Sequence, residues 1–235
     1  RFIKEVEYSE EALNQLWIEF IKYRIIYDFE YWAYSFIFIK DKVSPKDIPF
    51  KLNRAQRRVL NKLEKLRKAG KPIKFILLKA RQWGGSTLVQ IYMLWIMLVH
   101  RRNWNTVICG DVETQSRNVR AMITKALNKY PSYLLGETVK FTPFEGSSKN
   151  KVIQNTNCVV SIGSFQKPDT LRSGDISGAH LTEIGLWRAT PGKKPEDLIQ
   201  SISGSIYDTA YTILGLESTA KGVGNFFHRT WQQAV

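Results

Sequence analysis

The chain has 235 residues, of which 43% are hydrophobic and 12% aromatic, so a substantial core is expected and disorder over most of the chain is excluded. Its formal charge of +14 favours a polyanionic partner, nucleic acid before membrane, because neutralising phosphates releases counterions. The alternative is a soluble protein that is merely basic. Two cysteines and three histidines lie scattered without metal-binding spacing, which argues against a zinc site or a disulfide framework and favours a reducing compartment.

The chain begins with an aromatic-rich segment that predicts helix, and two prolines within residues 43–50 then break the pattern. We therefore expect a helical extension over residues 1–45, followed by a main domain over residues 46–235. The main domain begins with a predicted helix over residues 54–68, whose apolar side chains share one face and whose start Asn53 can cap. The basic side chains on the rest of that helix are one candidate contact for phosphates.

Five apolar, β-rich segments alternate with helical patterns in the main domain. Strands interleaved with helices form a mostly parallel sheet that helices cover on both faces. The predicted fold class is therefore α/β with a mostly parallel central sheet. The longest apolar run, residues 88–99, is too short to span a bilayer. The predicted strands are residues 73–79, 106–111, 158–164, 179–183 and 211–217, and the clearest helix between them is 114–129.

One connection between these elements has the layout of a phosphate-binding loop. In residues 79–87, KARQWGGST, a tight glycine turn separates an apolar strand from an apolar helix. Gly84 and Gly85 permit a close approach of the backbone to phosphate, and the helix that follows points the positive end of its dipole there. Ser86, with Thr87 beside it, offers a hydroxyl to Mg²⁺.

This loop lacks the usual lysine, because Gly85 occupies that position. Lys79 and Arg81 flank the turn and are the candidates to supply the missing positive charge. An ordinary strand–turn–helix connection with incidental basic residues explains this stretch alone equally well. The rest of the chain therefore decides between the two interpretations.

A second apolar segment ends in a carboxylate, as the other half of a nucleoside-triphosphatase site requires. Ala179, His180 and Leu181 lead to Thr182 and Glu183. Glu183 is the candidate catalytic base, which orients the attacking water and contacts the metal via water. Thr182 stands where such sites usually carry an aspartate, and its hydroxyl can hydrogen-bond a metal-bound water. A surface glutamate after a strand is the alternative interpretation.

Three segments, in this order along the chain, resemble the large terminase subunits, the DNA-packaging ATPases of tailed phages and related viruses. KARQWGGST is similar to the family's deviant Walker A loop, in which some members place the lysine early, where Lys79 stands. AHLTEIGLW resembles the acid strand, and LESTAKGVGNFFHRTW resembles the coupling motif. Ahead of them, Gln56 resembles the adenine-recognising glutamine of packaging ATPases, although a polar residue on a basic helix needs no ligand. The resemblance covers residues 50–231 and lies in the order and spacing of these pieces.

The resemblance implies roles for individual residues. Arg81 and Gln82 match the family's Arg-Gln pair, with the arginine near the γ-phosphate. Arg172, in LRSG, matches a candidate arginine finger for a neighbouring subunit, and a loop arginine or a DNA contact is the alternative. Ser218 and Thr219 are the residues that couple hydrolysis to domain motion. The implied catalytic residues are Glu183, Arg81 and Arg172, and the implied nucleotide-binding residues are Gln56, Lys79, Arg81, Gln82, Gly84, Gly85, Ser86 and Thr87.

The resemblance further implies a P-loop NTPase of the ASCE type that uses ATP and Mg²⁺ to move double-stranded DNA into a viral procapsid. The implied partners are the DNA, a ring of identical subunits taken as a pentamer, the portal protein and the small terminase subunit, in the host cytoplasm and without a membrane. Arg117 and Arg120 are a second candidate contact for DNA phosphates. No carboxylate cluster follows Trp231, so we expect the ATPase half without the nuclease domain. The alternatives are a helicase-like DNA-dependent ATPase and a nucleic-acid-binding domain with a degenerate nucleotide site.

Overall fold

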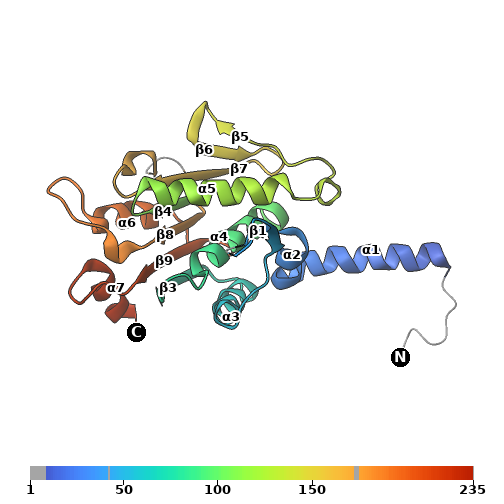
Figure 1. Cartoon of the computed structure of the whole chain (residues 1–235), viewed down its shortest axis with the longest axis horizontal. Coiled ribbons are helices and arrows are strands. Elements are labelled where there is room, and N and C mark those ends of the chain that lie inside the picture. Colours follow the sequence, from blue (N-terminus) through green and yellow to red (C-terminus); the bar gives the residue numbers. More distant parts are fainter. Residues whose placement is uncertain (1–8, 42, 172–174, 235) are drawn as a thin grey trace.

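A computed structural model describes residues 9–41, 43–171 and 175–234 (Figure 1). Its centre is a seven-stranded sheet in the order β3-β9-β8-β4-β7-β6-β5. The first five strands in that order run parallel to one another, and the last two pair antiparallel. The strands are β3 (Ile73–Lys79), β4 (Thr106–Gly110), β5 (Phe141–Phe144), β6 (Ser147–Ile153), β7 (Cys158–Ser164), β8 (Gly178–Thr182) and β9 (Ile213–Thr219).

The predicted α/β class with a mostly parallel sheet is confirmed, and the five predicted strands are the five parallel ones. β9 begins at Ile213 instead of residue 211. Tyr211 has a left-handed φ of 70°, and the hydroxyl of Thr212 donates back to the carbonyl of Thr209 at 2.7 Å, so a turn precedes the strand. The hairpin of β5 and β6 is not among the predicted strands, because its sequence mixes proline, glycine and charged residues.

Helices flank the sheet. α5 packs on β4 and β7, α4 packs on β8, and α3 and α7 pack on β3. α4 is buried along most of its length and continues into a π-helical segment, Ile96–His100, which explains why this part of the sequence is apolar without a polar face. The helices of this part are α3 (Arg54–Lys68), α4 (Gly85–Trp95), α5 (Glu113–Asn128), α6 (Pro195–Gly204) and α7 (Phe226–Ala234).

The N-terminal helices differ in how they meet the sheet domain. α1 (Glu10–Tyr27) projects away from the body in Figure 1, whereas α2 (Phe29–Phe36) packs into the main core. The ring centroid of Phe29 lies 5.3 Å from that of Tyr92 and 5.4 Å from that of Trp95, and both of these residues are on α4. The predicted division of the chain at residue 45 stays a prediction. The remaining elements are the short strands β1 (Phe38–Lys40) and β2 (Asp47–Pro49) and the 3₁₀ turns Ser132–Leu134, Pro168–Leu171 and Ile184–Leu186.

A search for membrane-spanning helices is negative within the described ranges, since no helix there combines the length and apolarity that crossing a bilayer requires.

Candidate functional site

The predicted phosphate-binding loop connects β3 to α4 and is held by the start of α3. Gly84 immediately precedes α4 and has a φ of 84°, a left-handed conformation that glycine adopts without strain. Its carbonyl accepts a hydrogen bond from Gln56 Nε2 at 2.9 Å, and a Cβ atom on Gly84 would lie 2.7 Å from that nitrogen. Asn53 Nδ2 donates to the neighbouring carbonyl of Trp83 at 2.9 Å. The N-terminus of α3 therefore fixes the shape of the loop.

Gln56 is buried, and its amide is engaged at both ends. Its Oε1 atom accepts from the backbone N–H of Asn53 at 2.9 Å, while Nε2 holds the carbonyl of Gly84. Asn53 accepts in turn from the backbone N–H of Gln56, which completes a capping box at the start of α3. Gln56 thus supports the loop, and its recognition of adenine stays a prediction.

Lys79, the last residue of β3, lies against the start of α4. Its Nζ atom is 2.8 Å from Ser86 Oγ, 3.0 Å from Glu183 Oε1 and 3.0 Å from Glu217 Oε1. Burial lowers the pKa of Lys79, but the two carboxylates outweigh burial and raise that pKa above its ordinary value. A charged lysine therefore stands beside the loop hydroxyl, where the resemblance to the early-lysine loops requires it.

The other predicted loop residues lie in the turn or at the start of the helix. Arg81 and Gln82 are exposed in the turn, and Gln82 has a left-handed φ of 61°. Residues 85–87 form the first turn of α4, where backbone N–H groups have no partner within a helix and can bind an anion. Arg172 lies outside the described residues, so its role as an arginine finger stays a prediction.

Glu183 directly follows β8 and has a φ of 58°, a conformation that is uncommon for a residue other than glycine. Its two carboxylate oxygens are held separately, Oε1 by Lys79 and Oε2 by Thr219, whose hydroxyl donates at 3.2 Å. Ser218 Oγ accepts from the backbone N–H of Gly185 at 2.9 Å. The candidate base and the candidate coupling residues are thus neighbours, and their contacts hold the strained backbone after β8.

Glu217, for which the sequence predicts no role, lies at the centre of this cluster. Its side chain is 0% exposed, and its Oε1 atom accepts from Ser86 Oγ and, at 2.7 Å, from Thr182 Oγ1. The same oxygen lies 3.0 Å from Lys79 Nζ and 3.4 Å from His180 Nε2. Among the residues that the structure describes, no donor hydrogen-bonds the other oxygen, Oε2.

The groups around Glu217 favour the ionised form of its carboxyl. Burial raises the pKa of Glu217, but His180, Lys79 and Ser86 together lower it below its ordinary value. The sequence offers one signal for this residue, a glutamate inside the apolar strand segment ILGLEST. Glutamate is almost never fully buried unless it is paired, so a charge in a central strand indicates a partner or a ligand.

A cavity of about 310 Å³ opens beside the cluster. In the described part of the chain, no group of three or more histidine, cysteine, aspartate or glutamate side chains could hold a metal ion by itself. Hydroxyl and carboxylate oxygens nevertheless line the cavity, and Mg²⁺ is usually bound by one or two such groups together with substrate phosphates. The chemistry of the wall therefore fits Mg²⁺ that arrives with a nucleotide. The cavity is lined by Ser86, Thr87, Gln90, Gln115, Asn118, Val119, Met122, Thr182 and Glu183.

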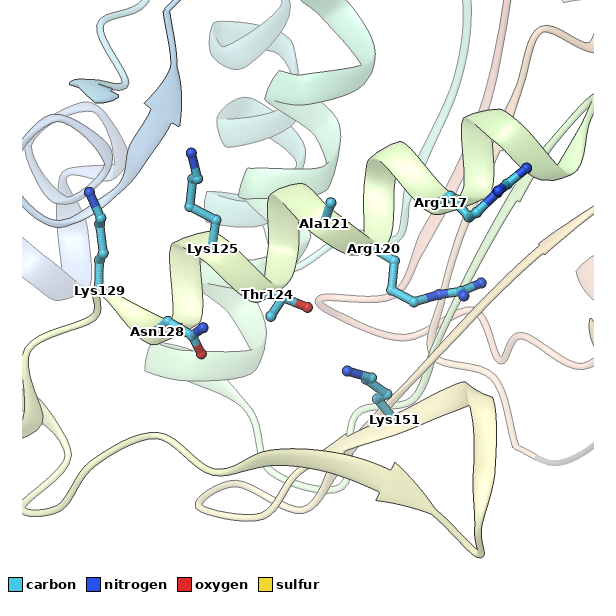
Figure 2. Close-up of a pocket in the computed structure, with 8 residues that line it drawn as sticks. All are labelled: Arg117, Arg120, Ala121, Thr124, Lys125, Asn128, Lys129 and Lys151. Carbon is cyan, nitrogen blue, oxygen red and sulfur yellow. The ribbon is translucent and has the colours of Figure 1, made fainter. Parts of the chain in front are cut away.

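A basic groove of about 620 Å³ lies along α5 and faces β6 (Figure 2). Arg117 extends from α5, and Lys151 extends from the strand opposite. Lys125 and Lys129 turn away from that strand to Asp47, with Nζ–Oδ distances of 2.6 and 2.5 Å. The groove thus presents arginine and lysine at one end and carboxylate-paired lysines at the other. It is lined by Arg117, Arg120, Ala121, Thr124, Lys125, Asn128, Lys129 and Lys151.

No family model matches the sequence, and no curated protein matches it. Among solved structures, the large terminase of bacteriophage HK97 is 21% identical with a TM-score of 0.62, over 84% of this chain and 37% of that one. A mutant of the Thermus phage P74-26 large terminase ATPase domain is 14% identical with a TM-score of 0.51, over 77% of this chain and 69% of that one. The large terminase of a thermophilic bacteriophage, in complex with ADP, is 13% identical with a TM-score of 0.51, over 78% of this chain and 42% of that one. The chain therefore has the fold of the ATPase domain of phage large terminases.

Proposed function

We propose that the chain is the ATPase domain of a viral DNA-packaging motor, which hydrolyses ATP with Mg²⁺ to move double-stranded DNA into a procapsid. The observation that carries the proposal is the convergence of Lys79, Ser86 and Glu183 from the end of one strand, the start of a helix and the end of a second strand. These residues supply the cation, the hydroxyl and the carboxylate that phosphoryl transfer needs in one place. The fold shared with terminases, one of them in complex with ADP, supports the same assignment.

In the proposed mechanism, the loop backbone and the N-terminus of α4 bind the phosphates, and Gln56 recognises the adenine. Lys79 and Arg81 neutralise the charge that develops on the γ-phosphoryl group. Ser86 would hold Mg²⁺ through its hydroxyl, and Glu183 would contact the ion via water. Bound Mg²⁺ would supply positive charge beside the phosphates. Glu183 orients the attacking water and accepts its proton.

Coupling and assembly follow from the neighbours of Glu183. Because Thr219 donates to Glu183 and Ser218 holds the segment after it, loss of the γ-phosphate is expected to change both contacts and to move the surface that grips DNA. Arg172 is proposed to reach the phosphates of an adjacent subunit in a homo-oligomeric ring, taken as a pentamer on the portal protein. We further propose that the chain acts with the small terminase subunit, in the host cytoplasm.

Calorimetry with ATP and Mg²⁺, followed by a turnover assay, tests the proposal. We expect the isolated chain to bind ATP and to hydrolyse it slowly, because a finger supplied by a neighbouring subunit requires assembly. A lack of triphosphate affinity at millimolar concentrations contradicts the motor and leaves a nucleic-acid-binding domain with a degenerate nucleotide site. ATP-dependent strand separation of a duplex would instead identify a helicase-like enzyme.

The basic groove predicts the DNA-binding face. Arg117→Ala and Lys151→Ala, on its two sides, are each expected to weaken binding of double-stranded DNA regardless of sequence. Each is expected to reduce the slope of log K against log salt concentration by about 1, because one phosphate contact releases about one counterion. Fluorescence anisotropy with a labelled duplex at several salt concentrations measures both effects.

Lys62→Ala is the matched control, since Lys62 is an exposed lysine on the basic face of α3. We expect this variant to keep the salt slope of the wild type. If Lys62→Ala lowers the slope and the two groove variants do not, α3 carries the DNA contact and the groove does not.

A further inference from the structure

We infer that Glu217 is the carboxylate that positions the Mg²⁺ of the bound nucleotide, in place of the aspartate that is absent at Thr182. This inference rests on the proposed function, because it assumes that ATP binds with Mg²⁺ at the loop. It assigns a metal-positioning role to β9, the strand between the phosphate-loop strand β3 and the acid strand β8.

The pairing of the strands brings Glu217 to the required place. β9 is parallel to both neighbours, and Glu217 is in register with Thr182 on β8. Side chains in register on neighbouring strands leave the same face of the sheet, so a carboxylate at either position points toward α4. Glu217 Oε1 does accept a hydrogen bond from Ser86 Oγ on α4, the hydroxyl proposed to ligand the ion. The glutamate therefore reaches the metal hydroxyl from the neighbouring strand.

The lack of a partner for the second carboxylate oxygen of Glu217 indicates a ligand from outside the chain. Glu217 is completely buried, and within the described ranges its Oε2 atom has no hydrogen-bond partner. An unpartnered anionic oxygen in a buried site is costly and rare in folded proteins, unless something outside the chain satisfies it. Mg²⁺ retains several waters when it binds to a protein with a nucleotide, and such a water is a hydrogen-bond donor. One oxygen of Glu217 thus accepts hydrogen bonds from protein groups, and the other is left to accept one from a water of the hydrated ion.

Thr182 fits this arrangement as the partner of Glu217. Its hydroxyl donates to Glu217 Oε1 at 2.7 Å, so the threonine orients the glutamate instead of replacing the missing charge. An aspartate at position 182 would bring two carboxylates within hydrogen-bonding distance, where like charges disfavour each other's ionised form. The paired positions 182 and 217 therefore accommodate a single carboxylate between them, on either of the two strands. Moving it from β9 to β8 should preserve the metal site.

A different role for Glu217 makes a different prediction. If the residue serves only as the buried counter-ion of Lys79, its removal changes the melting temperature and the nucleotide affinity equally with and without Mg²⁺. If it positions the ion, its removal selectively weakens the affinity that Mg²⁺ adds. The comparison of Mg²⁺ with EDTA therefore separates the two roles.

The test measures binding of a non-hydrolysable ATP analogue by calorimetry in Mg²⁺ and in EDTA, and Mn²⁺ binding to the analogue complex by water-proton relaxation. For Glu217→Gln we expect a loss of affinity of about 10–100-fold in Mg²⁺ and for Mn²⁺, the usual effect of losing an outer-shell metal partner, with the EDTA affinity little changed. For Thr182→Asp/Glu217→Gln we expect the Mg²⁺ and Mn²⁺ affinities to return toward the wild-type values. Glu137→Gln, at an exposed surface pair with Lys140, is the matched control.

The outcomes separate the two proposals. One outcome is that Mg²⁺ strengthens analogue binding by the wild type while Glu217→Gln binds the analogue in Mg²⁺ as tightly as the wild type does. That result contradicts the role of Glu217 and leaves the ATPase proposal standing. A wild type that binds no analogue in either buffer overturns the ATPase. If Glu217→Gln does not fold, the double variant decides, because a metal effect retained by Thr182→Asp/Glu217→Gln supports the inference and a lost metal effect contradicts it.

Discussion

Glu183→Gln is expected to retain ATP binding and to reduce hydrolysis by about 10²–10⁴-fold, the range that a positioned general base contributes. The amide keeps the size of the side chain and can still accept from the hydroxyl of Thr219, but it cannot take a proton from water. Lys79 keeps its contact with Glu217, so this lysine loses only one of its two carboxylate partners. Single-turnover hydrolysis, together with calorimetric ATP affinity, separates the chemical step from binding.

Glu196→Gln provides the matched control for this experiment. Glu196 pairs with Arg229 at 3.0 Å and is 43% exposed, so the substitution removes a carboxylate from an ion pair at the surface. We expect its hydrolysis rate to equal that of the wild type. Hydrolysis at the full rate in Glu183→Gln would exclude Glu183 as the base.

Lys79→Ala is expected to lose about 2–5 kcal/mol of binding free energy for ATP, because it removes the cation proposed for the phosphates from a partly desolvated site. It is also expected to lower the free energy of unfolding by about 3–5 kcal/mol, since Glu217 stays buried without its cation. Calorimetry and denaturant unfolding measure the two effects. Turnover at the wild-type rate would refute the assignment of Lys79 as the early lysine of the loop.

A double variant separates the loss of binding from the loss of stability. Lys79→Met/Glu217→Gln removes the fully buried carboxylate together with its cation and leaves only Glu183, which is 18% exposed, without Lys79. Part of the unfolding free energy should therefore return while ATP binding stays weak. Lys74→Ala is the control on the same strand, because Lys74 is 52% exposed and pairs with Asp208 at the surface. We expect Lys74→Ala to bind and hydrolyse ATP as the wild type does.

The parallel centre of the sheet is predictable from local sequence. Strands that are largely buried appear as short continuous apolar runs, and residues 158–164 are bounded in the structure as the sequence predicts. The edge hairpin of β5 and β6 is different, because its strands pack only partly against the core and their sequence carries turn and charged residues. The start of β9 depends on the turn at Tyr211, a conformation that its sequence does not signal.

The candidate site, like the sheet, can be predicted from the local sequence only in part. The contact of Lys79 with Ser86 follows from local geometry, because a strand end and the start of the next helix must lie close across a short turn. The role of Glu217 depends instead on which strand lies between β3 and β8. Strand order is a property of the whole fold, so the sequence around Glu217 shows only that a charge interrupts an apolar segment.

β9 contacts both parts of the site through consecutive residues. Side chains alternate along a strand, so Glu217 and Thr219 leave one face of the sheet while Ser218 leaves the other, where it holds the backbone of Gly185. In the proposed motor, β9 would therefore connect the phosphate site on one face of the sheet to the segment after β8 on the other face. Residues 220–225 join that element to α7. The mechanical output of each catalytic cycle is therefore expected to leave the sheet at α7.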